Sequence, residues 1–235
     1  GLIGTEFASR QPADGYTLLV SHASVHVYAT ATRRTMPFDP LNDFTHMGML
    51  VEAPMLLLVR AESPYQTLAQ YIEAAKTKPV RYGSSGIGSA NHLFGELLKI
   101  DGQAREHDHV PYQGSAPAIK DLMAGLIDGV FDPVTTNVTQ LKGGTLRALA
   151  VSTTSRLTAL PNIPTFAEQG FKDLVFREWF GFYLPGKPAA DLVARVNGAL
   201  RAALAAPEVV EGLAVMGLEA ASSTPEELAA MQKSD

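Results

Sequence analysis

Two short stretches, YGSSGIGS at residues 82–89 and VPYQGSAP at residues 110–117, decide how this chain is expected to fold. Each follows an apolar segment and opens a segment with helical spacing, so we predict a strand-to-helix turn at both places. Backbone amides at a helix start lack intrahelical partners and carry the positive end of the helix dipole. Two such turns facing one crevice would form a receptor for an anion. Neither turn contains an obvious nucleophile, base or metal ligand, which favours binding over catalysis.

The pattern around these turns is typical of an α/β protein. We predict strands at residues 16–21, 44–50, 55–59, 80–82, 107–110, 129–131, 146–151 and 179–184. We predict helices at residues 68–76, 89–100, 116–124, 189–205 and 207–216, and a last helix after a capping box at residues 224–227. Strands that alternate with helices indicate βαβ units and a parallel sheet covered on both faces.

The composition limits the class of protein. The chain has 235 residues, of which 46% are hydrophobic, so one large or two modest domains can bury a core. The net charge of −5 at pH 7 offers no basic surface, so no nucleic-acid partner is expected. The sequence contains no cysteine, which excludes disulfides, thiolate catalysis and cysteine-bound metals. No apolar run approaches the roughly 18 residues of a membrane span, so we expect no insertion into a membrane.

Polar residues at the two turns and at a further strand end are the candidates for a site. Ser84 and Ser85 are interpreted either as hydroxyls that touch a ligand or as helix caps. Asp132 follows an apolar strand, where open α/β sheets place their ligand crevice. It either receives a ligand hydroxyl or amine or caps the turn that follows. The histidines, among them His107 and His109 on one side of a strand, lack complete sets of metal ligands, so we expect no metal and no cofactor.

Six motifs occur in order along the chain. They are DGYTLL (14–19), MPFDP (36–40), YGSSG (82–86), HVPYQGSAPA (109–118), LRALAV (146–151) and WFG (179–181). Together they resemble the substrate-binding proteins of tripartite tricarboxylate transporters, also called Bug receptors. The resemblance covers essentially the whole chain, and the ordered set of motifs makes it specific.

The resemblance implies a two-domain periplasmic binding protein of the Venus-flytrap type, α/β in class, with a mostly parallel sheet flanked by helices in each domain. It implies a first domain of residues 1–60 plus 177–235, a second domain of residues 61–176, and a ligand cleft between them. The implied function is that of a bacterial periplasmic receptor. Such a receptor binds a small carboxylate, which is a di- or tricarboxylate, an amino acid or an aromatic acid, and delivers it to a membrane permease. It is not an enzyme and has no catalytic residues.

The resemblance also implies which residues bind the ligand. The ligand carboxylate meets the two turns, with help from a strand end in the first domain and from the end of an apolar strand in the second. The residues concerned are Ser21, Ser24, Ser84, Ser85, Gly86, Gly88, Ser89, Tyr112, Gly114, Ser115, Ala116 and Asp132.

Two rival functions and one departure from the family stay open. One rival is an α/β enzyme that uses Asp132 with a histidine as an acid–base pair on a carboxylate substrate. The other is a sensory ligand-binding domain, which the residues alone do not separate from a transport receptor. The family normally has a strand, a turn, a helix and a second strand before the DGYT motif, whereas 13 residues precede it here. We therefore expect that this chain lacks that segment and a signal peptide.

Overall fold

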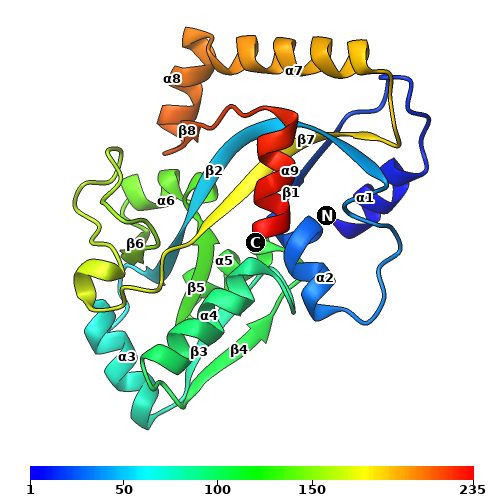
Figure 1. The fold of residues 1–235 in the computed structure, drawn as a ribbon. Helices are drawn as coiled ribbons and strands as arrows, with labels where there is room; N and C mark the ends of the chain where they lie inside the picture. The colour runs from blue at the N-terminus through cyan, green and yellow to red at the C-terminus, as the bar shows by residue number, and fades with distance from the viewer. The chain divides into compact units, whose positions relative to one another are not determined.

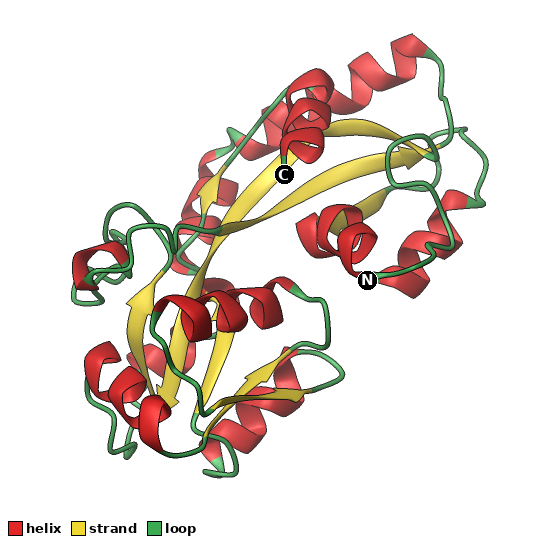
Figure 2. Cartoon of the chain, turned by 60° about the horizontal axis from the view of Figure 1, so that its bottom comes forward, coloured by secondary structure: helices red, strands yellow, loops and turns green.

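The chain forms two compact units. The computed structural model describes the backbone of all 235 residues and every side chain except those of Arg177 and Glu219. Unit 1 consists of Gly1–Glu52 and Glu178–Asp235, and unit 2 consists of Ala53–Arg177. Figure 1 labels the helices and strands, and Figure 2 separates helices, strands and loops by colour. Within the described residues, every helix is too short or too polar to cross a bilayer.

A mixed sheet with the strand order β6-β2-β5-β3-β4 forms the centre of unit 2. Its strands are β2 (Phe44–Arg60), β3 (Val80–Ser84), β4 (His107–Pro111), β5 (Gly129–Pro133) and β6 (Leu146–Val151). Strand β3 pairs in parallel with β4 and β5, whereas β2 pairs antiparallel with β5 and β6. Because β3, β4 and β5 run in the same direction, their carboxyl ends meet at one edge of the sheet.

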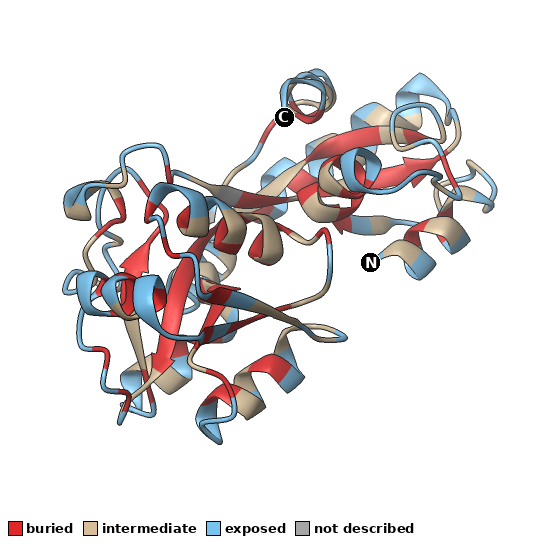
Figure 3. Ribbon diagram, turned by 90° about the horizontal axis from the view of Figure 1, so that it is seen from below, coloured by how far each residue is buried: buried red, intermediate tan, exposed pale blue. Residues whose placement is uncertain are grey.

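Amphipathic helices pack on this sheet. They are α3 (Leu68–Thr77), α4 (Ala90–Asp101), α5 (Ser115–Met123) and α6 (Val138–Lys142), with the short 3-10 helices η2 (Val134–Thr136) and η3 (Ala167–Gln169). Leu68 and Ile72 of α3, and Phe94 and Leu98 of α4, are buried at a spacing of four residues, as expected for one face of a helix. Figure 3 shows buried residues along the strands, whereas the helices also carry exposed residues.

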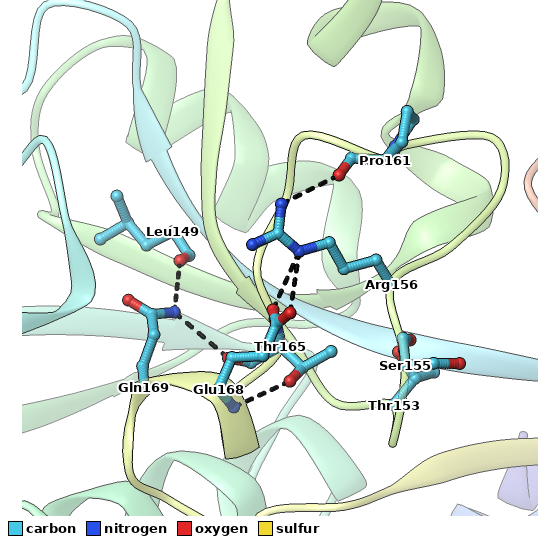
Figure 4. Close-up of polar contacts among 8 residues, drawn as sticks. All are labelled: Leu149, Thr153, Ser155, Arg156, Pro161, Thr165, Glu168 and Gln169. Carbon is cyan, nitrogen blue, oxygen red and sulfur yellow. Dashed lines mark hydrogen bonds and ion pairs between the residues drawn. The ribbon is translucent and has the colours of Figure 1, made fainter.

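The loop that follows β6 is held by its own polar contacts (Figure 4). Nε of Arg156 donates to both carboxylate oxygens of Glu168, at 3.0 Å each, and Nη1 donates to the carbonyl of Pro161 at 3.2 Å. The hydroxyl of Thr165 accepts from the amide of Glu168 at 3.0 Å. Arg156 and Glu168 are exposed, so their ion pair contributes little to stability, and the fully buried Phe166 anchors the loop instead.

Unit 1 combines an antiparallel sheet with helices from both ends of the chain. Its elements are α1 (Leu2–Ser9), β1 (Leu19–His22), the π-helix η1 (Ser24–Tyr28), α2 (Ala29–Thr32), β7 (Arg177–Pro185), α7 (Ala190–Leu204), α8 (Pro207–Val215), β8 (Glu219–Ala220) and α9 (Pro225–Ser234). Strand β7 lies between β1 and the first part of β2. The predicted capping box is present at the start of α9, where the Thr224 hydroxyl accepts from the amide of Glu227.

Aromatic residues form the core of unit 1. Trp179 and Tyr183 of β7 are buried together with Leu228 of α9. The ring of His26 stacks on that of Tyr183, with 4.3 Å between the ring centroids. The indole nitrogen of Trp179 donates to the carboxylate of Asp235 at 2.8 Å, so the polar end of this buried side chain is satisfied.

The sheets differ in part from the prediction of mostly parallel pairing. Unit 2 contains the parallel pairs β3–β4 and β3–β5, which the alternating pattern predicts. In unit 1 the pairs β1–β7 and β2–β8 are antiparallel. The paired strands of unit 1 are far apart in sequence, so their direction depends on tertiary contacts that the local pattern does not contain.

Strand β2 is continuous, although the sequence predicts two strands and a domain crossing near residue 60. It runs unbroken over Phe44–Arg60, and the boundary between the units falls inside it, after Glu52. Pro54 suggests a break because it has no amide hydrogen to donate to a neighbouring strand. It is tolerated because it lies between two pairing registers: Glu52 pairs with β8, and Met55 pairs with β5.

Candidate functional site

The turn between β3 and α4 is closed by its own side chains. Ser89 is the N-cap of α4, and its hydroxyl accepts from the amide of His92 at 3.3 Å and donates to the carbonyl of Gly86 at 2.7 Å. Gly86 and Gly88 have φ of 134° and 77°, which only glycine adopts readily. The Gly88 amide donates to Nδ1 of His92 at 3.2 Å. Part of the donor capacity at this helix start is therefore used inside the protein.

Ser84 supports this turn from within the protein. Its side chain is fully buried, and its Oγ lies 2.6 Å from Nε2 of His109 on β4. The same oxygen accepts from the amide of Gly86 at 3.1 Å. The His109 ring stacks on that of His92, with 4.0 Å between the centroids. Burial and the neighbouring His92 lower the pKa of His109 to about 4, so its ring is neutral at pH 7.

The turn between β4 and α5 leaves its helix start open. Gly114 precedes α5 with φ 107° and ψ 173°, a conformation almost restricted to glycine, and none of the described side chains caps this helix. A Cβ on Gly114 would meet no atom within 4 Å, so there is open space beside it. Pro117 has no N–H, which leaves the amides of Ser115 and Ala116 as the first donors. This helix start therefore presents amides and a positive dipole end.

The two turns lie side by side at one edge of the sheet in unit 2. The amide of Tyr112 donates to the carbonyl of Ser84 at 3.1 Å, and the amide of Gly114 donates to the carbonyl of Ser85 at 3.3 Å. These contacts continue the parallel pairing of β3 with β4. The structure thus brings together the candidate residues of both turns.

Asp132, at the end of β5, is a buried hub that connects to both turns. One carboxylate oxygen accepts from the hydroxyl of Ser115 and from Nδ2 of Asn91 at 3.2 Å. The other accepts from the hydroxyl of Thr136 at 2.5 Å and from Nδ2 of Asn137 at 2.7 Å. Burial raises the pKa of Asp132, and the four hydrogen bonds act in the opposite direction.

This hub bears on two expectations for Asp132. The sequence predicts that its carboxylate receives a ligand group or caps the turn that follows, and in the structure it is fully buried and accepts from Thr136 and Asn137 in that turn. The rival enzyme requires a histidine beside Asp132. Among the described residues its hydrogen-bond partners are Ser115, Asn91, Thr136 and Asn137, and none of them is a histidine.

Asn91 links the first turn to the hub, and it is missing from the residues predicted from sequence. Its Nδ2 donates to the carbonyl of Phe131 at 2.6 Å as well as to Asp132, and its Oδ1 accepts from the hydroxyl of Ser85 at 3.0 Å. Asn91 is 6% exposed, although it lies in the first turn of α4. The sequence feature that could have indicated Asn91 is its position three residues before the buried Phe94, which places a polar side chain on the side of α4 that faces the sheet.

The remaining candidates, Ser21 and Ser24, belong to unit 1. Ser21 lies on β1, is 2% exposed and pairs in register with Gly181. Ser24 begins η1, and its amide donates to Oε1 of Glu178 at 2.9 Å. The same oxygen lies 2.7 Å from Nδ1 of His22. The buried Glu178 carboxylate therefore occupies the amide of Ser24, a residue that the resemblance assigns to the ligand site.

The fold and the site define a class of protein. The chain crosses from unit 1 to unit 2 within β2 and returns at β7, and both units combine strands with flanking helices. This is the two-domain α/β architecture of periplasmic binding proteins, and solved members of that class superimpose closely on it. The unit 2 site adds amides and hydroxyls at helix starts, which are groups that bind anions.

The chain belongs to the tripartite tricarboxylate transporter receptor family, TctC, whose model matches residues 1–234. A protein from the tcbD-tcbE intergenic region of a Pseudomonas species is 34% identical over 100% of this chain and 70% of its own length. The structure of the periplasmic binding protein BugD is 30% identical, with a TM-score of 0.92, over 99% of this chain and 79% of that one.

A third comparison adds a structure solved with a ligand. The structure of R. palustris Rpa4515 with adipate is 31% identical to this chain, with a TM-score of 0.95, over 100% of this chain and 79% of that one. The comparisons confirm the resemblance inferred from the six motifs, the α/β two-domain architecture and the assignment as a receptor of the tripartite transporter type.

Proposed function

We propose that this protein is a periplasmic receptor that binds a small carboxylate and delivers it, chemically unaltered, to the membrane permease of a tripartite transporter. The ligand is a di- or tricarboxylate, an amino acid or an aromatic acid. Membership in the receptor family and the adipate in Rpa4515 support this proposal. The structural observation that carries it is the uncapped start of α5 with open space beside Gly114.

We assign the ligand contacts to the two turns of unit 2. The contacting residues are Ser85, Gly86, Gly88, Tyr112, Gly114, Ser115 and Ala116. Ser84, Ser89 and Asp132 hold these turns in place through the hydrogen bonds described above. The net charge of −5 disfavours an anion at long range, so affinity depends on the local amides and on the dipole of α5.

Calorimetric titration of the full chain tests the proposal. We expect saturable binding of at least one compound from a panel of adipate, other C4 to C6 dicarboxylates, citrate and aromatic acids. NMR spectra of the recovered ligand should match those of the compound added, because a receptor returns its ligand unaltered. Turnover would favour the rival enzyme, and silence across the panel with folded protein would contradict the proposal.

A charge placed at the open helix start tests the location of the site. Ala116→Glu adds a carboxylate to the first turn of α5, so we expect binding at least about tenfold weaker because like charges repel. A negative charge at a helix start stabilises the helix, so the melting temperature should not fall. Met123→Glu, at the exposed last residue of α5, is the matched control and should leave the affinity unchanged. Equal losses in both variants would contradict the assigned site.

A further inference from the structure

The hydrogen bonds of Asn91 fix the direction of the Ser85 proton. Nδ2 of Asn91 lies against two acceptors, the carbonyl of Phe131 at 2.6 Å and the carboxylate of Asp132 at 3.2 Å. The reverse orientation of the amide would place its oxygen against these two oxygens, where it has nothing to accept. Oδ1 of Asn91 therefore faces Ser85, and the Ser85 hydroxyl donates its single proton to it at 3.0 Å.

The proton of Ser115 is directed into the protein in the same way. Its hydroxyl contacts the Asp132 oxygen that also accepts from Asn91. The other oxygen accepts from Thr136 and Asn137, so the other described partners of this carboxylate are all donors. The Ser115 hydroxyl likewise donates to the carboxylate oxygen that it contacts.

Both serines therefore present acceptors, not donors, to a ligand. A hydroxyl has one proton and two lone pairs, and Ser85 and Ser115 each use the proton inside the protein. Both residues are half-buried, so part of each remains accessible. The neighbouring start of α5 supplies amide donors. The surface thus combines donors suited to a carboxylate with acceptors suited to a hydrogen-bond donor beside it.

We propose that this site selects carboxylates that carry a hydroxyl or ammonium group on the carbon next to the carboxylate, and that Ser85 and Ser115 recognise this group. The inference rests on the proposed function, because it takes the two turns as the ligand site. Asn91 and Asp132 are positioning residues that act on the ligand through the two serines. A plain carboxylate of the same length leaves the serine oxygens without a partner once it has displaced their water, and this weakens its binding.

Matched pairs of ligands test the inference. The pairs are succinate and malate, adipate and 2-aminoadipate, and 3-phenylpropionate and 3-phenyllactate, which differ by one donor group beside a carboxylate. In every pair that binds to the full chain, we expect the donor-bearing member to bind about tenfold more tightly, as one added hydrogen bond allows. Calorimetric titration of both members under one buffer condition measures this ratio.

Variants at Ser115 test whether this serine produces the difference in affinity within each ligand pair. Ser115→Ala removes one acceptor, so we expect the ratio within a pair to fall from about tenfold to about threefold. Ser115→Thr keeps the hydroxyl and should retain the full ratio. Ser234→Ala, which removes an exposed hydroxyl bonded to a main-chain carbonyl in unit 1, is the matched control and should leave both affinities unchanged.

The outcomes separate this inference from the proposed function. Equal affinities within the pairs would overturn the inference and leave the carboxylate receptor standing. A ratio that survives both Ser115→Ala and Ser85→Ala would also overturn it, because recognition would then lie elsewhere. If none of the six compounds binds to folded protein, both the inference and the carboxylate site fail for these ligand classes.

Discussion

The helix starts of α4 and α5 have similar sequences, but they differ in whether a side chain caps the helix. Both follow parallel strands, and both turns are rich in glycine and serine. At α4 the Ser89 hydroxyl caps the helix, and His92 accepts from the amide of Gly88. At α5 the residue in the cap position is Gly114, which has no side chain to offer, and no described side chain takes its place. The protein uses part of the donor capacity at the first start, whereas no described side chain caps the second.

This difference teaches that a polar turn at a helix start is not by itself a binding site. Serine in the cap position consumes an amide, whereas glycine in the same position leaves the amides open. The two starts remain coupled because Ser85 reaches Asp132 through Asn91, and Ser115 reaches it directly. Three predictions test this comparison of the two helix starts.

The largest effect is expected from Asp132→Ala, which removes the hub that both helix starts share. The amide donors of Asn91 and Asn137 would lose a buried acceptor, so we expect the free energy of unfolding to fall by about 3 kcal/mol or more. Denaturant titration measures the loss. Asp128→Ala, before the other end of β5, removes a single hydrogen bond to a main-chain amide and serves as the control, with an expected loss of about 1 kcal/mol. Equal losses would argue against a hub.

A smaller effect is expected from substitution of the two cap positions. Gly114→Ala meets no atom within 4 Å, so its cost is backbone strain alone, about 2 kcal/mol for this region of φ and ψ. Ser89→Ala loses a helix cap, which costs about 1 kcal/mol. Thermal unfolding of both variants shows which of the two substitutions costs more stability. The control is Ser89→Gly, because glycine replaces a serine cap at a cost of only a few tenths of a kcal/mol. A neutral Gly114→Ala would contradict the strained backbone.

The smallest effect is the pH dependence that His109 contributes at the first start, where it contacts Ser84. The folded protein holds the pKa of His109 at about 4, below its ordinary 6.5, because of burial and His92, while Glu96 acts in the opposite direction. The unfolded chain therefore binds more protons between pH 4 and 6.5, so this contribution is complete above pH 6.5 and is lost as the pH falls through that window.

The free energy of unfolding, measured against pH, checks this expectation. In His109→Gln the slope between pH 4 and 6.5 should be shallower than in the unaltered protein, because one of the groups with a lowered pKa is gone. His107 and His26 also have lowered pKa values, to about 3 and about 4, because of burial, so part of the slope should remain. If the slope of the free energy of unfolding against pH stayed the same, His109 would have no part in the pH dependence.

The sequence predicts elements of both units where the signal is local. Helices α4 and α5 and strand β6 of unit 2, and helices α7 and α8 of unit 1, lie within about two residues of their predicted positions, because hydrophobic periodicity and turn residues act locally. Helix α1 is missing from the prediction, since exposed Ile3 and Phe7 give it no clean polar face. The continuity of β2 across Pro54 depends on partners that are distant in sequence, which no local pattern contains.

The candidate site shows the same limit. The two turns are visible as glycine and serine stretches, whereas the role of each serine depends on what lies beside it in space. Ser84 contacts His109, 25 residues away, and Ser115 contacts Asp132, 17 residues away. Sequence alone therefore gives the location of the turns. It does not distinguish the buried serine that supports a turn from the serine that is only half-buried.

The single tryptophan provides an optical reporter for one unit only. Trp179 is buried in unit 1, where its indole donates to Asp235, and every aromatic fluorophore of unit 2 is a tyrosine or a phenylalanine. Emission excited at about 295 nm, which selects tryptophan over tyrosine, follows the environment of unit 1. Comparison of that signal with the far-ultraviolet circular dichroism of the whole chain will show whether the two halves melt as one cooperative block or in succession.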